Sequence, residues 1–109
     1  MDGLNREIND FDLIIKNGTL VDGTGAKSKQ GNIAIKNGII VAIGDFSGKA
    51  NEVIDANNLV VTPGFVDIHT HYDGQAIWDS QLKPSSIHGV TTVVMGNCGV
   101  GFAPCKPED

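Results

Sequence analysis

The 109-residue chain has few of the features that would place it in a membrane, on nucleic acid or in an oxidising compartment. No apolar run approaches the roughly 18–20 residues that span a bilayer, and the polar residues 1–7 contain no hydrophobic signal segment. Lys and Arg number only 8 against 13 Asp and Glu, a formal net charge of −5. This charge argues against nucleic acid or an anionic membrane surface as partner.

Cysteine is scarce, since Cys98 and Cys105 are the only two in the chain. We therefore expect a cytoplasmic chain without a structural disulfide, in which Cys105 is an incidental thiol. Glycine, in contrast, is abundant, with 14 residues, about double its usual share of roughly 7%. Many glycines predict many tight turns and short strands.

Residues 1–61 are expected to form a small antiparallel β domain, the N-terminal half of a sandwich. Asn17-Gly18 and Asn37-Gly38 each separate two apolar runs. Asn-Gly favours a two-residue hairpin turn because both residues tolerate positive φ. We therefore expect a hairpin at each pair, followed by short strands over residues 53–55 and 59–61.

Residues 62–109 have a different character. We expect a strand over 64–70, a short helix that begins near Pro84 and stops at Gly89, and a strand over 90–95 that is covered on both faces. Strand, short crossover and strand, with ligands at the strand ends, is how an α/β barrel begins. The expected fold class is therefore mixed α/β: a small β domain, then the first strands of an incomplete TIM-like barrel.

Two histidines at the end of the first of these strands predict half of a metal site. Side chains alternate along a strand, so Asp67, His69 and His71 share a face. The two histidines are separated by roughly 6–7 Å of strand, and their rings can converge on one ion at about 2.0–2.1 Å from each nitrogen. A buried face carrying these groups is costly unless they are paired or bound to metal. Neutral nitrogen donors suit zinc.

Other polar residues lie close to these histidines in sequence or in the expected topology. Cys98 follows the next parallel strand, so its thiolate could bind the same ion at about 2.3 Å; a small buried thiol is the alternative. Asp67 either orients a histidine from outside the coordination shell or caps nearby backbone N–H groups. Tyr72 and Asp73 are candidate substrate contacts. Trp78 could line the same mouth, although packing in the core or anchoring of the loop is favoured.

Three stretches of this sequence resemble the amidohydrolase superfamily, and specifically its D-aminoacylase (N-acyl-D-amino-acid deacylase) family: residues 21–25, 61–71 and 88–104. The pattern Pro-Gly-x-x-Asp-x-His-x-His is typical of the superfamily, whereas Gly-Asn-Cys-Gly is more particular to the deacylases. The resemblance implies a barrel flanked by a small β domain that is built from both chain ends. It also implies hydrolysis of the amide bond of small N-acyl-D-amino acids by metal-activated water, with His69, His71 and Cys98 as zinc ligands.

The sequence departs from the family in its length. The family's other metal histidines and its catalytic aspartate lie downstream of this sequence, and a full barrel takes about 250 residues. We therefore expect a truncated enzyme that has no appreciable deacylase activity alone, with open sheet edges that favour self-association.

Two alternatives stay open. A cyclic-amide hydrolase of the same superfamily, similar to dihydropyrimidinase or dihydroorotase, would use a modified lysine as bridging ligand, so the role of Cys98 distinguishes it. A non-catalytic β module that binds a partner, such as the rest of its barrel, would fold independently of metal.

Overall fold

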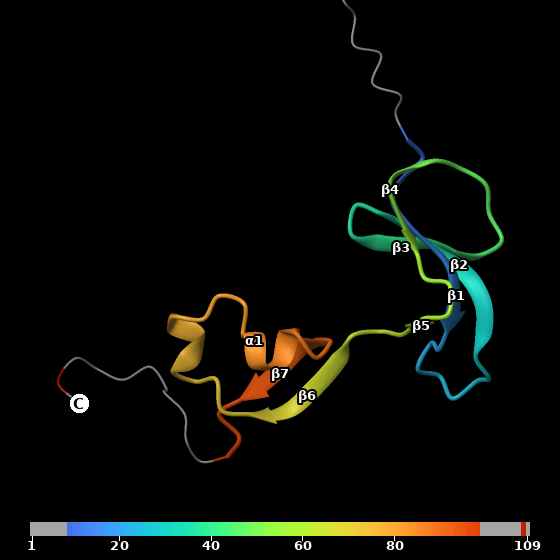
Figure 1. The fold of residues 1–109 in the computed structure, drawn as a ribbon. Helices are drawn as coiled ribbons and strands as arrows, with labels where there is room; N and C mark the ends of the chain where they lie inside the picture. Colours follow the sequence, from blue (N-terminus) through green and yellow to red (C-terminus); the bar gives the residue numbers. More distant parts are fainter. Residues whose placement is uncertain (1–8, 99–107, 109) are drawn as a thin grey trace, which may run out of the picture. The chain divides into compact units, whose positions relative to one another are not determined.

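The computed structural model describes residues 9–98 and residue 108, and the chain divides into two compact units, Met1–Pro63 and Gly64–Asp109. The first unit holds five strands: β1 (Phe11–Leu20), β2 (Lys29–Lys36), β3 (Ile39–Gly44), β4 (Ala50–Asp55) and β5 (Val60–Val61) (Figure 1). The second holds β6 (Phe65–Thr70), the 3-10 helix η1 (Gln75–Ile77), α1 (Lys83–Ser86) and β7 (Val90–Met95). Cys105 and the Gly99–Pro104 part of the family pattern lie outside the described residues.

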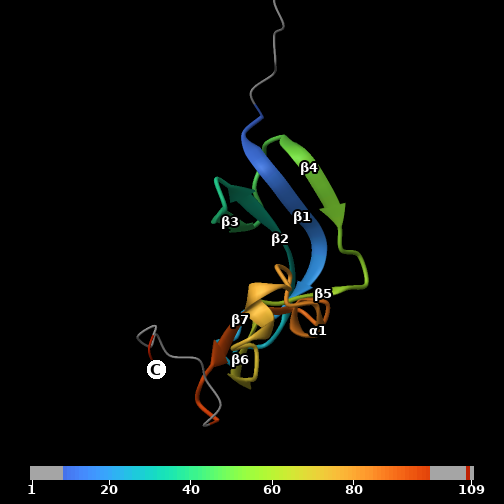
Figure 2. The ribbon, with the colours of Figure 1, turned by 90° about the vertical axis from the view of Figure 1, so that its left-hand side faces the viewer.

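The sheet of the first unit is mixed, so the expectation of an antiparallel β domain is wrong. Its order is β3-β2-β1-β4, and β5 pairs with the far end of β1 (Figure 2). β2 runs antiparallel to β1 and β3, but β4 and β5 run parallel to β1. The connection after β3 returns the chain to the start of β1, where the rings of Phe11 and Phe46 pack edge to face at 5.5 Å. Strand patterns predict strands but not the direction in which they pair.

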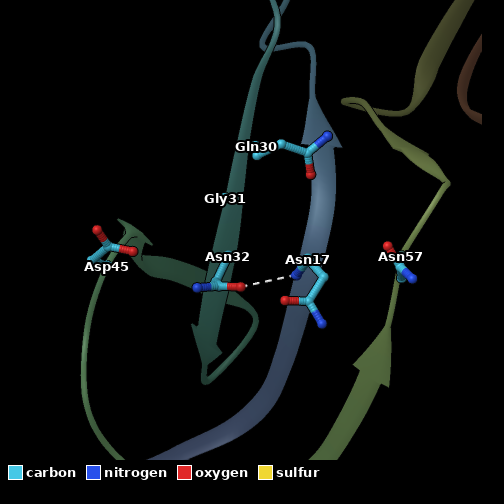
Figure 3. Close-up of a pocket in the computed structure, with 6 residues that line it drawn as sticks. All are labelled: Asn17, Gln30, Gly31, Asn32, Asp45 and Asn57. Carbon is cyan, nitrogen blue, oxygen red and sulfur yellow. Dashed lines mark hydrogen bonds between the residues drawn. The ribbon is translucent and has the colours of Figure 1, made fainter.

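Asn17-Gly18 forms a β-bulge rather than the expected hairpin. β1 continues through this pair, and its register against β2 shifts between Ile15 and Gly18. Only Asn17 has positive φ (62°), whereas a two-residue hairpin of this type needs it at both positions. Two side chains hold the bulge. Asn32 Oδ1 accepts the Asn17 backbone N–H at 2.9 Å (Figure 3). Asn17 Nδ2 donates to Asp55 Oδ1 at 3.0 Å.

The hairpin expected at Asn37-Gly38 is confirmed. Lys36 pairs with Ile39 across a two-residue turn, and φ is positive at both Asn37 (53°) and Gly38 (74°). These angles are typical of the type I′ turn, whose twist matches that of the flanking strands. The same dipeptide therefore gives a turn here and a bulge in β1.

The second unit is the expected strand–crossover–strand. β6 and β7 are parallel, and η1 and α1 lie between them in the chain. Pro84 lies in the first turn of α1, and two further turn hydrogen bonds lead to Gly89, whose φ is +85°. Trp78, for which core packing was favoured, is instead 73% exposed after η1.

Little apolar surface is buried in the described part of the chain. The buried apolar side chains are Leu20, Ala34, Ala56 and Tyr72. β7 was expected to be covered on both faces, yet Val94 and Met95 are about 40% exposed, because two strands and a short helix provide no second layer. Among the described helices, none combines the length and apolarity that a membrane crossing requires.

Candidate metal centre

The strand that carries the histidines lies very close to β7. A Cβ on Gly64 would come within 2.7 Å of the Thr91 Cβ, so a larger residue at the entry to β6 requires one of the two strands to shift. Phe65, Val66 and Ile68 are strand formers, which explains why the chain is extended from this point. Because β6 and β7 run parallel, their carboxyl ends lie at the same edge of the sheet.

The structure brings His69, His71 and Cys98 together. One candidate ligand atom from each, an imidazole nitrogen or the thiol sulfur, lies within 4.8 Å of the others. The two imidazole rings are nearly parallel, with centroids 5.6 Å apart and 23° between their planes. Ligand atoms around a tetrahedral zinc ion are roughly 3.3–3.6 Å apart. Side-chain rotations that move these atoms by about 1 Å would bring them to that spacing. Two imidazoles and one thiolate therefore fit zinc chemically.

The three side chains are exposed, and the expectation of a buried ligand face is wrong for the described residues. The buried residue of this strand end is Thr70, on the opposite face, with 7% exposure. Its hydroxyl donates to the Val94 carbonyl at 2.7 Å and ties β6 to β7. The histidines are exposed because none of the described residues packs over this edge of the two-stranded sheet.

Asp67 contacts the backbone of a candidate ligand residue. Its Oδ1 accepts the backbone N–H of His69 at 3.1 Å. Of the two roles considered from the sequence, this geometry corresponds to capping a backbone N–H. The bond orients the strand immediately before the imidazole.

Asn97 is a functional candidate that sequence reasoning missed. Its Nδ2 donates to the Ile68 carbonyl at 2.6 Å and so fastens the turn that carries Cys98 to β6. An amide directly before a candidate ligand was the available signal, but a local pattern does not name the distant carbonyl that it binds.

The two candidate substrate contacts have different environments. Tyr72 is buried, and its hydroxyl is 2.7 Å from the Ser85 Oγ in α1. Asp73 is half-buried, and its Oδ2 has neither solvent contact nor a hydrogen-bond partner among the described residues. Tyr72 thus anchors the short helix, while Asp73 keeps an unused acceptor.

The loop between η1 and α1 is organised by Asp79. The side-chain amide of Gln75 donates to its carboxylate at 3.0 Å, and the backbone N–H groups of Gln81 and Lys83 donate as well. These bonds, the Gln75 amide first, hold the pKa of Asp79 below its ordinary value. This carboxylate is engaged within its own loop.

The first unit contains a cavity of about 470 Å³, which is lined by Asn17, Gln30, Gly31, Asn32, Asp45 and Asn57 (Figure 3). Three of its amides are already bonded to the protein: Asn32 binds both the Asn17 N–H and the Gly44 carbonyl, Asn17 binds Asp55, and Gln30 binds Thr19. The hollow therefore reflects the construction of the bulge.

The part of the chain that contains β6 and β7 matches a known family. The profile of the amidohydrolase family matches residues 52–108, which include all three candidate ligands. This chain belongs to the amidohydrolase family. The resemblance inferred from the sequence is thereby confirmed.

Individual deacylases are similar to most of this amidohydrolase chain. N-acyl-D-aspartate deacylase of Alcaligenes xylosoxydans xylosoxydans is 47% identical over 94 residues, which are 85% of this chain and 19% of the relative. The structure of N-acyl-D-glutamate deacylase from Bordetella bronchiseptica, complexed with zinc and a phosphonate mimic of the tetrahedral intermediate, matches with a TM-score of 0.81. It is 38% identical, and the match covers 87% of this chain and 20% of that one.

A cyclic-amide hydrolase is also similar. L-hydantoinase (dihydropyrimidinase) from Arthrobacter aurescens matches with a TM-score of 0.67 and 28% identity, over 78% of this chain and 20% of its own. The amidohydrolase chain thus spans about a fifth of the length of these relatives.

Proposed function

We propose that this chain is the N-terminal segment of a zinc-dependent amidohydrolase that hydrolyses the amide bond of N-acyl-D-amino acids. The observation that carries the proposal is the convergence of His69, His71 and Cys98 within 4.8 Å at the ends of two parallel strands. Support comes from the deacylases named above. In this proposal residues 1–61 belong to the small β domain, and residues 62–109 begin the barrel.

The proposed ligands are the two imidazoles and the Cys98 thiolate. When bound, zinc supplies Lewis-acid polarisation of the acyl carbonyl and lowers the pKa of water. The chain's own contribution is to orient the ligands. Asp67 fixes the backbone at His69, and Asn97 holds the cysteine turn against β6. Outer hydrogen bonds of this kind set ligand orientation and affinity.

Substrate contact is proposed for Asp73 in preference to Tyr72. The Asp73 side chain follows the histidines and keeps an unpaired acceptor, whereas the Tyr72 hydroxyl is engaged with Ser85. The catalytic acid or base of the reaction is not assigned to any residue of this chain.

A cyclic-amide hydrolase is the second candidate, supported by the similarity to the hydantoinase. In that case a modified lysine from another strand would bridge the metals, and Cys98 would not be required for metal binding. The two candidates therefore differ in what removal of the thiol does.

The test is elemental analysis of zinc bound to the purified 109-residue chain after dialysis at neutral pH. Cys98→Ala and His71→Ala are compared with two matched controls, Cys105→Ala and His88→Ala. His88 is exposed and lies outside the three-residue cluster.

About one zinc per chain, lost in Cys98→Ala and His71→Ala but kept in both controls, is the result that the proposal requires. Zinc retained in full by Cys98→Ala would overturn the thiolate-ligated site and favour the cyclic-amide alternative. No zinc in the unmodified chain would show that the three side chains are insufficient to hold the ion.

A further inference from the structure

Asp73 has an unusual environment for an acidic side chain. Its Oδ2 is the one buried side-chain oxygen among the described residues that lacks a hydrogen-bond partner. Removing a carboxylate oxygen from water without giving it a donor costs free energy. A carboxylate that is kept in this position despite the free-energy cost is a candidate for a functional role.

The other oxygen of Asp73 lies beside the turn that follows β7. A Cβ added to Gly96 would be 3.4 Å from Asp73 Oδ1, which is van der Waals distance, so the carboxylate lies beside Gly96. Gly96 has φ +82°, a conformation that favours glycine, and precedes Cys98 by two residues. Asp73 follows His71 by two residues. The Asp73 carboxylate thus lies between the two segments that carry the candidate ligands.

Asn97 holds the same turn from a different direction. Its side-chain amide donates to the Ile68 carbonyl of β6 at 2.6 Å. The turn over residues 96–98 therefore has the Asn97 hydrogen bond on one side and the Asp73 carboxylate as a packing neighbour on another. With one of them removed, the thiol would sample more positions, and ordering it for metal binding would cost conformational entropy.

We propose that Asp73 is a positioning residue of the candidate metal centre. Its carboxylate supports the turn over residues 96–98 and keeps the Cys98 thiol within reach of His69 and His71. This inference rests on the proposed function for its consequence in metal binding. The Asp73 carboxylate would support the turn even without metal, so the order of the turn and the binding of metal are measured separately.

The first measurement is the NMR order parameter of the Asn97 and Cys98 amides in the metal-free 109-residue chain. Asp73→Ala and Asp73→Ser are too short to reach Gly96, whereas Asp73→Asn keeps the reach. Asp45→Asn is the matched control, because it removes the same charge at an exposed position of the first unit. Amide signals of β6 and β7 report whether the second unit stays folded.

We expect the two order parameters to fall from about 0.85 to below about 0.6 in the Ala and Ser variants, and to stay high in Asp73→Asn and the control. Unchanged values in the Ala and Ser variants would overturn the inference. Loss of all β6 and β7 signals in both would also overturn it, because Asp73 would then support the whole unit.

The second measurement is cobalt(II) binding, followed by the thiolate-to-cobalt charge-transfer absorption that reports a bound cysteine. Asp73→Ala should bind cobalt about 10–100-fold more weakly and show a weaker thiolate band, as expected for loss of an outer-shell contact. Affinity and band equal to those of Asp45→Asn would contradict the positioning role. If the unmodified chain binds no cobalt, the proposed metal centre fails, and the order parameters still decide the role of Asp73.

Discussion

Replacing Gly64 with alanine tests the close approach of β6 and β7 on which the site depends. An added Cβ would lie 2.7 Å from the Thr91 Cβ and closer still to its two γ atoms. The γ atoms could move by rotation, but the Thr91 Cβ is attached to the backbone of β7, so one strand must shift. Overpacking of this kind costs about 1–3 kcal/mol. Alanine offsets up to about 1 kcal/mol of this by reducing the freedom of the unfolded chain.

The assay is urea unfolding of the second unit, followed through its amide signals. With a slope of about 2 kcal/mol/M, a net loss of about 1–2 kcal/mol lowers the midpoint by about 0.5–1 M. Gly31→Ala, read through the amide signals of the first unit, is the contrasting variant, because its Cβ would meet the flexible end of Leu20 at 2.9 Å and should cost less.

A double-mutant cycle with Thr91→Gly isolates the contact. If the clash is the cause, removal of the Thr91 side chain should recover about 0.5–3 kcal/mol of the loss caused by Gly64→Ala. Additive effects of the two substitutions, or an unchanged midpoint in Gly64→Ala, would refute the reasoning.

Three further predictions concern the charge, the activity and the assembly of the chain. The hydrogen bond from the Asn17 side chain lowers the pKa of Asp55 below its ordinary 3.8. The ionised carboxylate therefore contributes stability above pH 3.8, and this contribution is lost as pH falls through the lower pKa of the folded state. In Asp55→Asn the urea midpoint should depend less on pH below about pH 4, and an equally steep loss of stability in acid would contradict this. The 109-residue chain alone should not hydrolyse N-acyl-D-amino acids; turnover that is abolished by His71→Ala would refute that expectation. The chain should self-associate through its exposed strand residues, which include Ile39 (64%) and Val60 (64%). Light scattering that reports only monomer at every concentration would contradict this prediction.

Several parts of the fold and the site could be predicted from local sequence patterns. The strands at residues 65–70 and 90–95 follow from runs of strand-forming residues, and the Asn37-Gly38 hairpin follows from turn chemistry. The pairing of His69 with His71 needs only the two-residue period of a strand. Cys98 could be added because parallel strands end at the same edge of a sheet. Each inference involves neighbours in sequence or one simple rule of topology.

Long-range contacts decided the rest, because their partners are distant in the chain. Asn17-Gly18 is a bulge since Asn32 and Asp55 bind Asn17 from two other strands, and no local pattern encodes that bond. The parallel direction of β4 and the exposure of the candidate ligands likewise depend on which elements pack together. Local chemistry thus determined where the strands and the candidate metal ligands lie. The tertiary structure alone decided how the strands pair, and it placed the Asp73 carboxylate against the cysteine turn.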